Sequence, residues 1–409
     1  MPFFQTKLRP EDFIVTEILD KEPSGEGDYH YILIEKKWLT TFLLIDLMIK
    51  DLWFNRNMIG IAWLKDKNAI TRQWISISKR DVAKYVGWVN DLLGWMRQKW
   101  KIIKATYAES MLKLGNNAGN HFDLTLVWTS LLSPEKKKAI ETFLDSIEKK
   151  GIPNFFGDQR FGYGWTNWKI WHELLAGTLR NIKWDVNTLA EKRFKVQAFA
   201  SYVFNQYVLE RDKKWLLYKK IAWDVIGKDK VSVTWPVPGD DLEVAKSDAG
   251  KLEKEVFEKT GLTKQLFDRF KVFGLFWIRR PLLVFPKKIT YTWRWKILFL
   301  TFDLPSGAYA TVLIDEIEKI LRWGLPVPEV VEQKWDKRYH NKPEGFELKI
   351  HDTPKPKRKV IEPGFNPYTG QKINTDKAQT RAFRAQKKEE KQKLFPKRWT
   401  PFKKKKESL

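Results

Sequence analysis

Residues 58–78 read MIGIAWLKDKNAITRQWISIS, two apolar runs on either side of a polar loop. The first run ends at Trp63, and the second, from Gln73 onward, alternates apolar and polar residues, so both predict short strands. The loop between them holds one acid, Asp66, with a lysine on either side. Adjacent cations favour the ionised carboxylate, and an ionised acid held between two strands suits a nucleophile or a general base. A basic turn in which Asp66 only binds its own backbone is the other interpretation, and local chemistry leaves both open.

The chain around this stretch mixes strand and helix patterns. Alternation of apolar and polar residues predicts strands at residues 12–18, 29–36, 101–107 and 121–128. Apolar residues at helical spacing predict helices at residues 40–54, 81–98 and 133–149, with Thr40 or Thr41 and then Ser133 as N-caps. The first 150 residues therefore predict a domain built from both strands and helices.

A region of different composition begins at Gly151. Residues 153–168 are dense in Gly, Asn and aromatic residues around Arg160, a loop that suits a phosphate, splayed bases or a packed hinge. Helical patterns then dominate, at residues 168–182, 190–218, 241–247 and 250–272, with a break predicted at 235–239. Strand alternation returns at residues 289–303 and a helix is predicted at 308–322. This order predicts a helical domain, residues 151–285, inserted between residues 1–150 and 286–349.

The last 60 residues lack apolar periodicity and are rich in Pro, Lys, Arg and Gln. They include the like-charge run Lys403–Lys406. We therefore predict a disordered basic tail at residues 350–409, with a transient helix at residues 376–393.

Composition indicates a soluble protein with a polyanionic partner. The net charge is +25, and residues 351–409 hold 18 Lys/Arg against 6 Asp/Glu. Such an excess favours nucleic acid, and no basic amphipathic helix supports the alternative of an anionic membrane surface. No apolar run has transmembrane length and the N-terminus lacks a signal-peptide pattern, which predicts a cytoplasmic protein.

Composition also argues against metal and thiol chemistry. The chain has no cysteine, so neither a disulfide nor a thiolate metal site is possible. Its five histidines are scattered without ligand spacing. We therefore expect no metal and no other cofactor.

Five motifs give the chain a strong resemblance to the tRNA pseudouridine synthase D family. Each motif alone is weak, but all five occur in the family's order across roughly residues 3–320. They are KLRPEDFIVTE at residues 7–17, KDKNAITRQ at 65–73, GNHF at 119–122, NFFGDQRFG at 154–162 and LPSGAYAT at 304–311. The resemblance implies an α+β fold, in which a helical insertion interrupts an antiparallel-sheet catalytic domain.

The resemblance also implies a function and a set of site residues. The family isomerises a uridine in the D-arm of tRNA, position 13 in tRNA numbering, without a cofactor. Asp66 occupies the position of the family's nucleophile. The expected substrate-binding residues are Lys7, Phe13, Lys65, Asn120, Phe122, Arg160 and Phe302. Phe122 could stack on a flat base or belong to the core, and the sequence leaves both interpretations open.

The chemistry of this reaction suits a single carboxylate. Turning uridine into pseudouridine breaks a C–N glycosidic bond and forms a C–C bond to the same ring. One carboxylate can start the reaction by attack or by proton abstraction at the ribose, and the sequence does not decide between them. The target base has to leave its stack, and aromatic side chains can hold it outside.

Two other functions fit less well. A non-catalytic basic RNA-binding or ribosome-associated protein explains the charge, but not a lone acid at the nucleophile position of the family. An RNA hydrolase would need several carboxylates or histidines at a metal site, and none cluster in the sequence.

Tryptophan is unusually common and unusually placed. The chain has 21 Trp and only 22 Gly, where average usage predicts roughly 29 Gly. Five Trp occur at expected turns, a helix end or motif neighbours, where glycine would fit better: Trp63, Trp100, Trp171, Trp235 and Trp277. One hypothesis is that some of these positions are glycine, encoded by UGA in an organism that translates this codon as glycine. A Trp-rich lineage with Trp in the core is the other.

Overall fold

The structure is a computed structural model that describes residues 3–37, 39–63, 69–161, 189–227, 232–239 and 245–323. The chain divides into two compact units, residues 1–346 and 347–409, and the described residues all belong to the first. The predicted basic tail, the predicted helix at 168–182 and the loop that carries Asp66 therefore lie outside the described residues. The predicted α+β fold class is confirmed.

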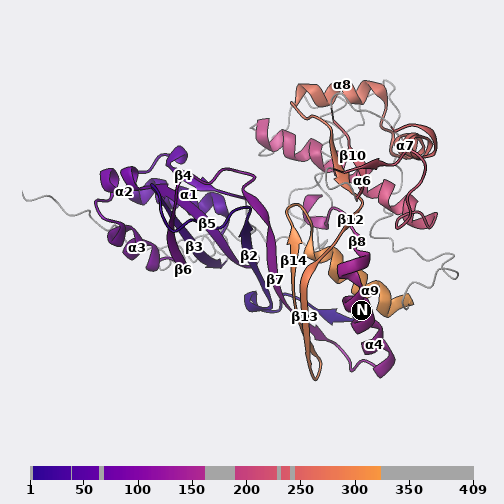
Figure 1. Ribbon diagram of the computed structural model, residues 1–409, viewed down its shortest axis with the longest axis horizontal. Helices are drawn as coiled ribbons and strands as arrows, with labels where there is room; N and C mark the ends of the chain where they lie inside the picture. Colours follow the sequence, from indigo (N-terminus) through magenta and orange to yellow (C-terminus); the bar gives the residue numbers. More distant parts are fainter. Residues whose placement is uncertain are drawn as a thin grey trace, which may run out of the picture. The chain divides into compact units, whose positions relative to one another are not determined.

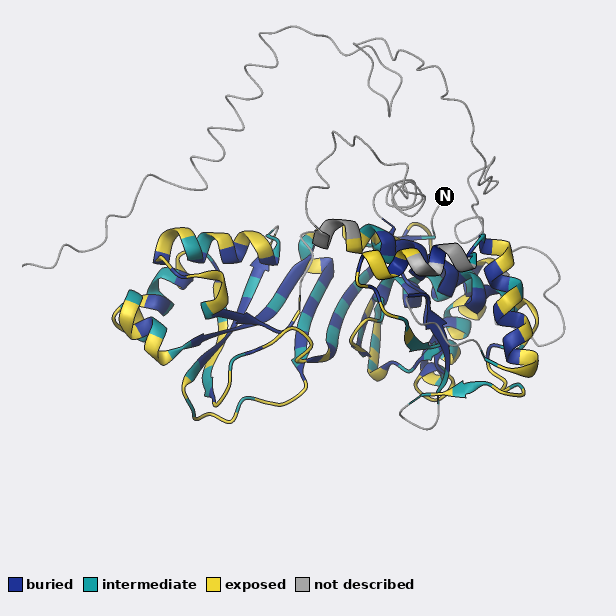
Figure 2. Ribbon diagram, turned by 90° about the horizontal axis from the view of Figure 1, so that it is seen from above, coloured by how far each residue is buried: buried dark blue, intermediate teal, exposed yellow. Residues whose placement is uncertain are grey.

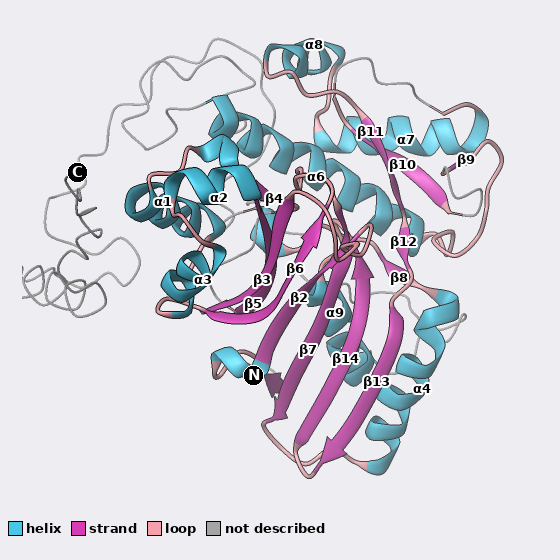
Figure 3. Cartoon of the chain, turned by 60° about the vertical axis from the view of Figure 1, so that its left-hand side comes forward, coloured by secondary structure: helices cyan, strands magenta, loops and turns pink. Residues whose placement is uncertain are grey.

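A nine-stranded sheet organises the described residues, in the order β13-β14-β7-β2-β5-β3-β6, with β1 paired to β7 and β4 paired to β5 (Figures 1 and 3). Among the described strands of this sheet, β2 and β5 form the one parallel pair. The strands are β1 (Phe4–Gln5), β2 (Phe13–Leu19), β3 (Tyr29–Lys37), β4 (Ile59–Ile61), β5 (Ile70–Ser78), β6 (Lys101–Ala108), β7 (Asn117–Trp128), β13 (Lys287–Arg294) and β14 (Ile297–Pro305).

Helices and short turns connect these strands. They are η1 (Pro10–Asp12), α1 (Thr41–Leu52), η2 (Arg56–Met58), α2 (Lys79–Tyr85), α3 (Val89–Arg97), α4 (Pro134–Lys150), η3 (Asp158–Arg160) and α9 (Ala310–Trp323). Thr40 caps α1, because its side chain accepts a hydrogen bond from the Leu43 N–H at 3.2 Å. Ser133 caps α4 in the same way, as predicted.

The prediction of one helix over residues 81–98 is wrong. The chain forms α2 and α3 instead, separated at Gly87, whose φ is 100°. The N–H groups of Val86 and Gly87 both donate to the Val82 carbonyl, which closes α2. A left-handed glycine therefore ends a helix that apolar periodicity alone would continue.

Two apolar clusters cover the same face of the sheet. Residues paired directly across strands share a face and side chains alternate, so Val15, its partner Thr71, and Ile75 point the same way. Val15 belongs to the cluster under α4 and α9, and Ile75 to the cluster under α1, α2 and α3. Figure 2 shows buried residues along the strands and exposed residues on the outward sides of the helices.

Residues 189–284 hold a third apolar cluster, on which α6 (Leu189–Lys213), α7 (Ser247–Thr260) and α8 (Lys264–Val272) pack. This region also contains strands. They are β9 (Val225–Ile226), β10 (Val233–Val237), β11 (Ile278–Pro281) and β12 (Leu283–Val284). β12 pairs with β8 (Ile152–Pro153), which precedes this region in the chain.

The break predicted in the helical pattern at residues 235–239 is confirmed, because this part of the chain forms strand β10 as far as Val237. Another prediction in this region is wrong. The helix expected at residues 250–272 is interrupted by Gly261, whose φ of 69° ends α7. In the described part of the chain, the helices are all too short or too polar to cross a membrane.

Candidate active site

Strand pairing gathers three of the five motifs on one face of the sheet. Phe302 of β14 pairs with Phe122 of β7, which pairs with Val15 of β2. One step along, Asn120 pairs with Glu17. Because paired residues share a face, the opening motif, GNHF and the strand that leads into LPSG present these side chains together.

An aromatic row, Phe13, Phe122 and Phe302, lies at the centre of this face. The rings of Phe122 and Phe302 stack with centroids 5.3 Å apart, and Phe13 meets Phe122 edge-on at 6.2 Å. The Lys7 ammonium lies 4.1 Å from the centre of the Phe13 ring. Four of the predicted site residues are therefore in contact, and the lysine places a positive charge at the end of the row.

Lys7 has a backbone conformation that lysine rarely adopts. Its φ is 59°, in the left-handed region. Strained backbone of this kind clusters at functional sites, where surrounding structure holds it. The conformation is consistent with a side chain held in place over Phe13.

The loop that carries Asp66 is tied down at both of its described ends. The Gln73 side chain donates to the Trp63 carbonyl at 2.6 Å and accepts from the Thr41 hydroxyl at 2.9 Å. Ala69, at the other end, is buried in the cluster that contains the aromatic row. Asp66 and Lys65 themselves lie outside the described residues, but the first described residue after them, Ala69, lies in the cluster that contains this row.

Glu17 is a buried carboxylate that the sequence did not single out as functional. Its side chain is 3% exposed and accepts the Trp74 N–H at 2.9 Å and the Asn117 amide at 3.4 Å. It therefore connects β2, β5 and β7 beside the predicted site. Its position as the last residue of the first motif is the one signal that could have identified it.

Arg160, another predicted site residue, contacts helix α6 and not the aromatic row. Its guanidinium donates to Ser201 at 3.1 Å and to Gln197 at 2.9 Å, both on α6. Burial lowers the pKa of Arg160. The neighbouring Phe156 is fixed to Asn205 through both its N–H and its carbonyl. The described part of this motif is thus a packed junction with α6.

Arg280 of β11 is a second charge that the sequence analysis missed. Its guanidinium donates to the Asn154 carbonyl at 3.1 and 3.2 Å and to the Asn154 side-chain oxygen at 2.6 Å. It also lies 4.1 Å from the centre of the Phe156 ring. Burial lowers the pKa of Arg280 to about 10; Tyr309 opposes that shift and nearby Arg160 adds to it. The guanidinium therefore stays charged at neutral pH.

A model of the family described as tRNA pseudouridine synthase D (TruD) matches residues 4–195 and 218–317, well over half of the chain. The chain belongs to the tRNA pseudouridine synthase D family. The resemblance drawn from the five motifs is confirmed, and with it the enzyme class, an isomerase that acts on RNA.

Bacterial relatives named tRNA pseudouridine synthase D align over most of their length. A relative from Thermus thermophilus is 30% identical over 346 residues, covering 77% of this chain and 89% of its own. The relative from Legionella pneumophila is 30% identical over 330 residues, covering 76% and 94%.

A solved structure shares the fold of this chain. It is a crystal structure of a Methanosarcina mazei protein assigned as a tRNA pseudouridine synthase D, with a TM-score of 0.57 and 20% identity. The match covers 78% of this chain and 94% of the other. At this identity the likeness supports the fold alone, and it agrees with the family assignment.

Proposed function

We propose that the protein converts a uridine in the D-arm of tRNA, position 13 in tRNA numbering, to pseudouridine, with Asp66 as the nucleophile. Membership of the family supports the reaction, and the bacterial relatives carry tRNA in their names. The observation that supports the site assignment is that the residues on either side of the Asp66 loop are fixed, Trp63 by the Gln73 side chain and Ala69 in the cluster that contains the aromatic row.

The proposed reaction needs a carboxylate at the ribose and a surface that holds the rotating base. The N1–C1′ bond of uridine breaks, the base rotates, and C5 forms the new bond to C1′. C5 then loses its proton, and N1 gains one. Asp66 starts the sequence by attack or proton abstraction at the ribose, and a carboxylate can do this without a bound cofactor.

The aromatic row takes the role of a floor for the flipped base. Phe122 is 6% exposed and stacks on Phe302, which is fully buried, so at most an edge of the Phe122 ring is open to the base. Asn120, two residues earlier on the same face, is in position to bind the polar edge of the base. Lys7 adds a cation for the ribose phosphate beside it.

Replacing Asp66 tests the nucleophile directly. Asp66→Asn removes the charge and keeps the shape, so we expect activity to fall by more than about a thousandfold, while the melting temperature and tRNA affinity stay close to those of the unmodified protein. The measurement is pseudouridine mapping in an unmodified tRNA transcript. A variant that keeps more than a few per cent of the activity would remove Asp66 from this role.

The alternative, a non-catalytic RNA-binding protein, makes a different prediction for the same experiment. It expects no pseudouridine from the unmodified protein, with tRNA binding intact. Mapping pseudouridine in total tRNA from cells with and without the gene then identifies the modified position, and a site outside the D-arm would overturn the proposed target.

A further inference from the structure

A cleft of about 510 Å³ adjoins the predicted base site. It is lined by Gly119 of β7, by Ser306 after β14 and by Arg280 of β11, among others. Gly119 pairs with Pro305 and directly precedes Asn120, so the cleft lies at the ends of β7 and β14. Because side chains alternate along a strand, Gly119 and Pro305 face away from the aromatic row. A cation in this cleft is in position to meet an RNA strand that runs past the ends of these strands.

Arg280 lines this cleft together with Asp303, whose carboxylate pairs with His121 and Lys288 and not with Arg280. Among the described residues its hydrogen bonds go only to Asn154, from Nε and Nη2, and it forms no ion pair. Nη1 points toward the loop after β14, since a Cβ built on Gly307 would lie 3.4 Å from it. A charge withdrawn from water normally has a counter-ion, and a guanidinium fork fits a phosphate.

We propose that Arg280 binds a backbone phosphate of the RNA next to the target uridine. This proposal rests on the function proposed above. Asn154 accepts from Nε and Nη2, which leaves Nη1, beside Gly307, for the phosphate.

Measuring tRNA affinity over a range of salt concentrations tests this role. We expect Arg280→Gln to lower affinity about tenfold and to reduce the slope of log K against log salt by about one contact. Arg294→Gln is the charge-matched control, because Arg294 is exposed at the far end of the β13–β14 hairpin and contacts Phe299. We expect the control to stay within about twofold.

A second variant covers the case in which Arg280→Gln does not fold. Ser306→Asp places a carboxylate in the same cleft without disturbing Phe156 or Asn154, and it should weaken tRNA binding by pairing with Arg280. Unchanged affinity and slope in a folded Arg280→Gln, or in Ser306→Asp, would overturn the proposal. Absence of pseudouridine with the unmodified protein would reject the enzymatic function instead, and the binding result would stand apart from it.

An independent observation concerns the tryptophans. Seven described residues other than glycine have left-handed backbone, and four of them are Trp. They are Trp53 (φ 60°), Trp215 (φ 56°), Trp223 (φ 66°) and Trp295 (φ 51°). Trp supplies 21 of 409 residues, so its share of these positions is far above its share of the chain. Left-handed backbone is unfavourable for a bulky side chain and easy for glycine.

Trp215 occupies the glycine position of a helix-ending motif. After α6, the Leu216 N–H donates to the Arg211 carbonyl at 2.8 Å, and the Trp215 N–H donates to the Asp212 carbonyl at 3.0 Å. This pair of bonds defines the Schellman motif, whose left-handed residue is usually glycine.

The same chain contains two matching motifs with glycine. Gly261 after α7 and Gly274 after α8 have φ of 69° and 59°. Each is followed by a leucine whose N–H reaches back five residues, from Leu262 to the Phe257 carbonyl and from Leu275 to the Phe270 carbonyl. The three helix ends thus share one geometry and a following leucine, and differ in having Gly, Gly and Trp.

The other three Trp lie at turns that also favour glycine. Trp295 and Lys296 form a two-residue hairpin between β13 and β14, and left-handed φ at the first of the two defines the type II′ turn. Trp223 is the third residue of a turn closed from the Asp224 N–H to the Ile221 carbonyl, the position that is left-handed in type II turns. Trp53 is the left-handed residue that ends α1.

None of these four indoles is buried. Their exposed fractions are 75% for Trp53, 41% for Trp215, 63% for Trp223 and 80% for Trp295. By contrast, Trp74 is 5% exposed and packs in an apolar cluster of the sheet. The backbone at the four positions is therefore left-handed, and packing of the indole side chain does not account for that conformation.

We infer that glycine occupies positions 53, 215, 223 and 295 of the native protein, because the codon there is UGA and the source cell translates it as glycine. A single cause, UGA read as tryptophan where the source cell reads glycine, explains the left-handed backbone at all four Trp. It also explains the excess of Trp and the deficit of Gly. A Trp-rich lineage explains the counts alone.

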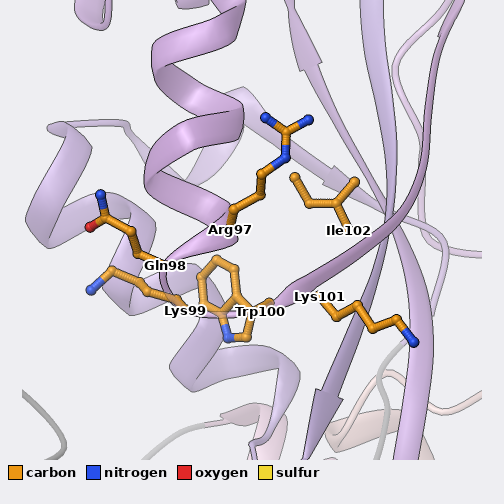
Figure 4. Close-up of a pocket in the computed structure, with 6 residues that line it drawn as sticks. All are labelled: Arg97, Gln98, Lys99, Trp100, Lys101 and Ile102. Carbon is orange, nitrogen blue, oxygen red and sulfur yellow. The ribbon is translucent and has the colours of Figure 1, made fainter.

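The five positions selected from sequence have a mixed outcome. Trp100 lies in the turn between α3 and β6 (Figure 4) and is buried against Trp95. Trp235 is wholly buried on Tyr207, and neither residue has left-handed backbone. Placing these two at strained turn positions was wrong. Trp63 is 45% exposed, Trp277 is partly buried, and Trp171 lies outside the described residues.

Peptide mass spectrometry of the native protein, together with the codons of the gene, tests this inference. We expect glycine mass and UGA at the four positions, and tryptophan mass and UGG at Trp74. Tryptophan mass or UGG at position 215 or 295 would overturn the inference.

Stability of the recombinant protein gives a second readout. Trp215→Gly and Trp295→Gly should each raise the melting temperature by roughly 2–4 °C, because they relieve a strained backbone without uncovering a core. The control Trp74→Gly should lower it. A lower melting temperature for both Trp215→Gly and Trp295→Gly would contradict the inference, because it would show that glycine does not relieve strain at these positions.

Discussion

At the scale of single residues, Glu17 stabilises the sheet, a role that its place in the motif did not predict. It satisfies the Trp74 N–H and the Asn117 amide inside the sheet. Removing a charged acceptor leaves buried donors unpaired, so Glu17→Ala should lower the free energy of unfolding by about 2 kcal/mol. Glu17→Gln keeps the volume and one acceptor and should lose less. Urea unfolding measures both, and an alanine variant within about 0.5 kcal/mol of the unmodified protein would show that these bonds matter little.

The sequence predicted some residues of the candidate site and missed others, because some contacts arise only when distant strands pair. Lys7, Phe13, Phe122 and Phe302 follow from motifs, and the structure brings them into contact. Whether Phe122 is a core residue could not be decided from the sequence. Its neighbour Phe302 is 180 residues away and comes next to it only through strand pairing. Arg280 has no motif around it, and only its contact with Asn154 and the cleft reveals it.

At the scale of elements, the contact between α6 and α9 should make stability depend on pH. Burial raises the pKa of Asp212 on α6 to about 7, with Lys319 of α9 opposing the shift and Glu316 adding to it. The unfolded value is about 3.9, so the folded state holds this proton more tightly. Its contribution to stability is therefore fully present below about pH 4 and lost by about pH 7.

The variant Asp212→Asn isolates this effect. Asparagine does not ionise, so the fall in melting temperature between pH 5 and pH 8 should be smaller in the variant than in the unmodified protein. Thermal unfolding followed by circular dichroism at both pH values measures the difference. Equal pH dependence in the two proteins would show that Asp212 titrates normally.

Element boundaries show what periodicity leaves out. Most strands and helices were predicted within a few residues, since their apolar patterns are strong. The two overlong helices failed at Gly87 and Gly261, where left-handed backbone stops a helix without interrupting the apolar pattern. Trp215 ends a helix in the same way, but a tryptophan gives no such signal in the sequence.

At the scale of the whole molecule, strand order was beyond the sequence. The order of the sheet places β2 between β7 and β5, and its pairing with β5 is parallel although the strands around it run antiparallel. That arrangement pairs Ile14 of the opening motif with Ile70, at the start of β5. Alternation predicts that a segment is a strand but does not identify its partner.

Charge is the whole-molecule property that sequence does determine, and it leads to a prediction about residues 350–409. The chain carries +25, and residues 351–409 contribute 18 Lys/Arg against 6 Asp/Glu. Cations that neutralise phosphates release counterions, so tRNA affinity should fall steeply with salt. A segment of this composition provides charge without a fixed surface for reading shape, so we expect its deletion to reduce the salt slope and leave the choice of uridine unchanged. Affinity titrations over a range of salt, with pseudouridine mapping on the same tRNA, measure both. A truncated protein that modifies a different uridine would make the tail a specificity element, because charge alone does not move the position of a modification.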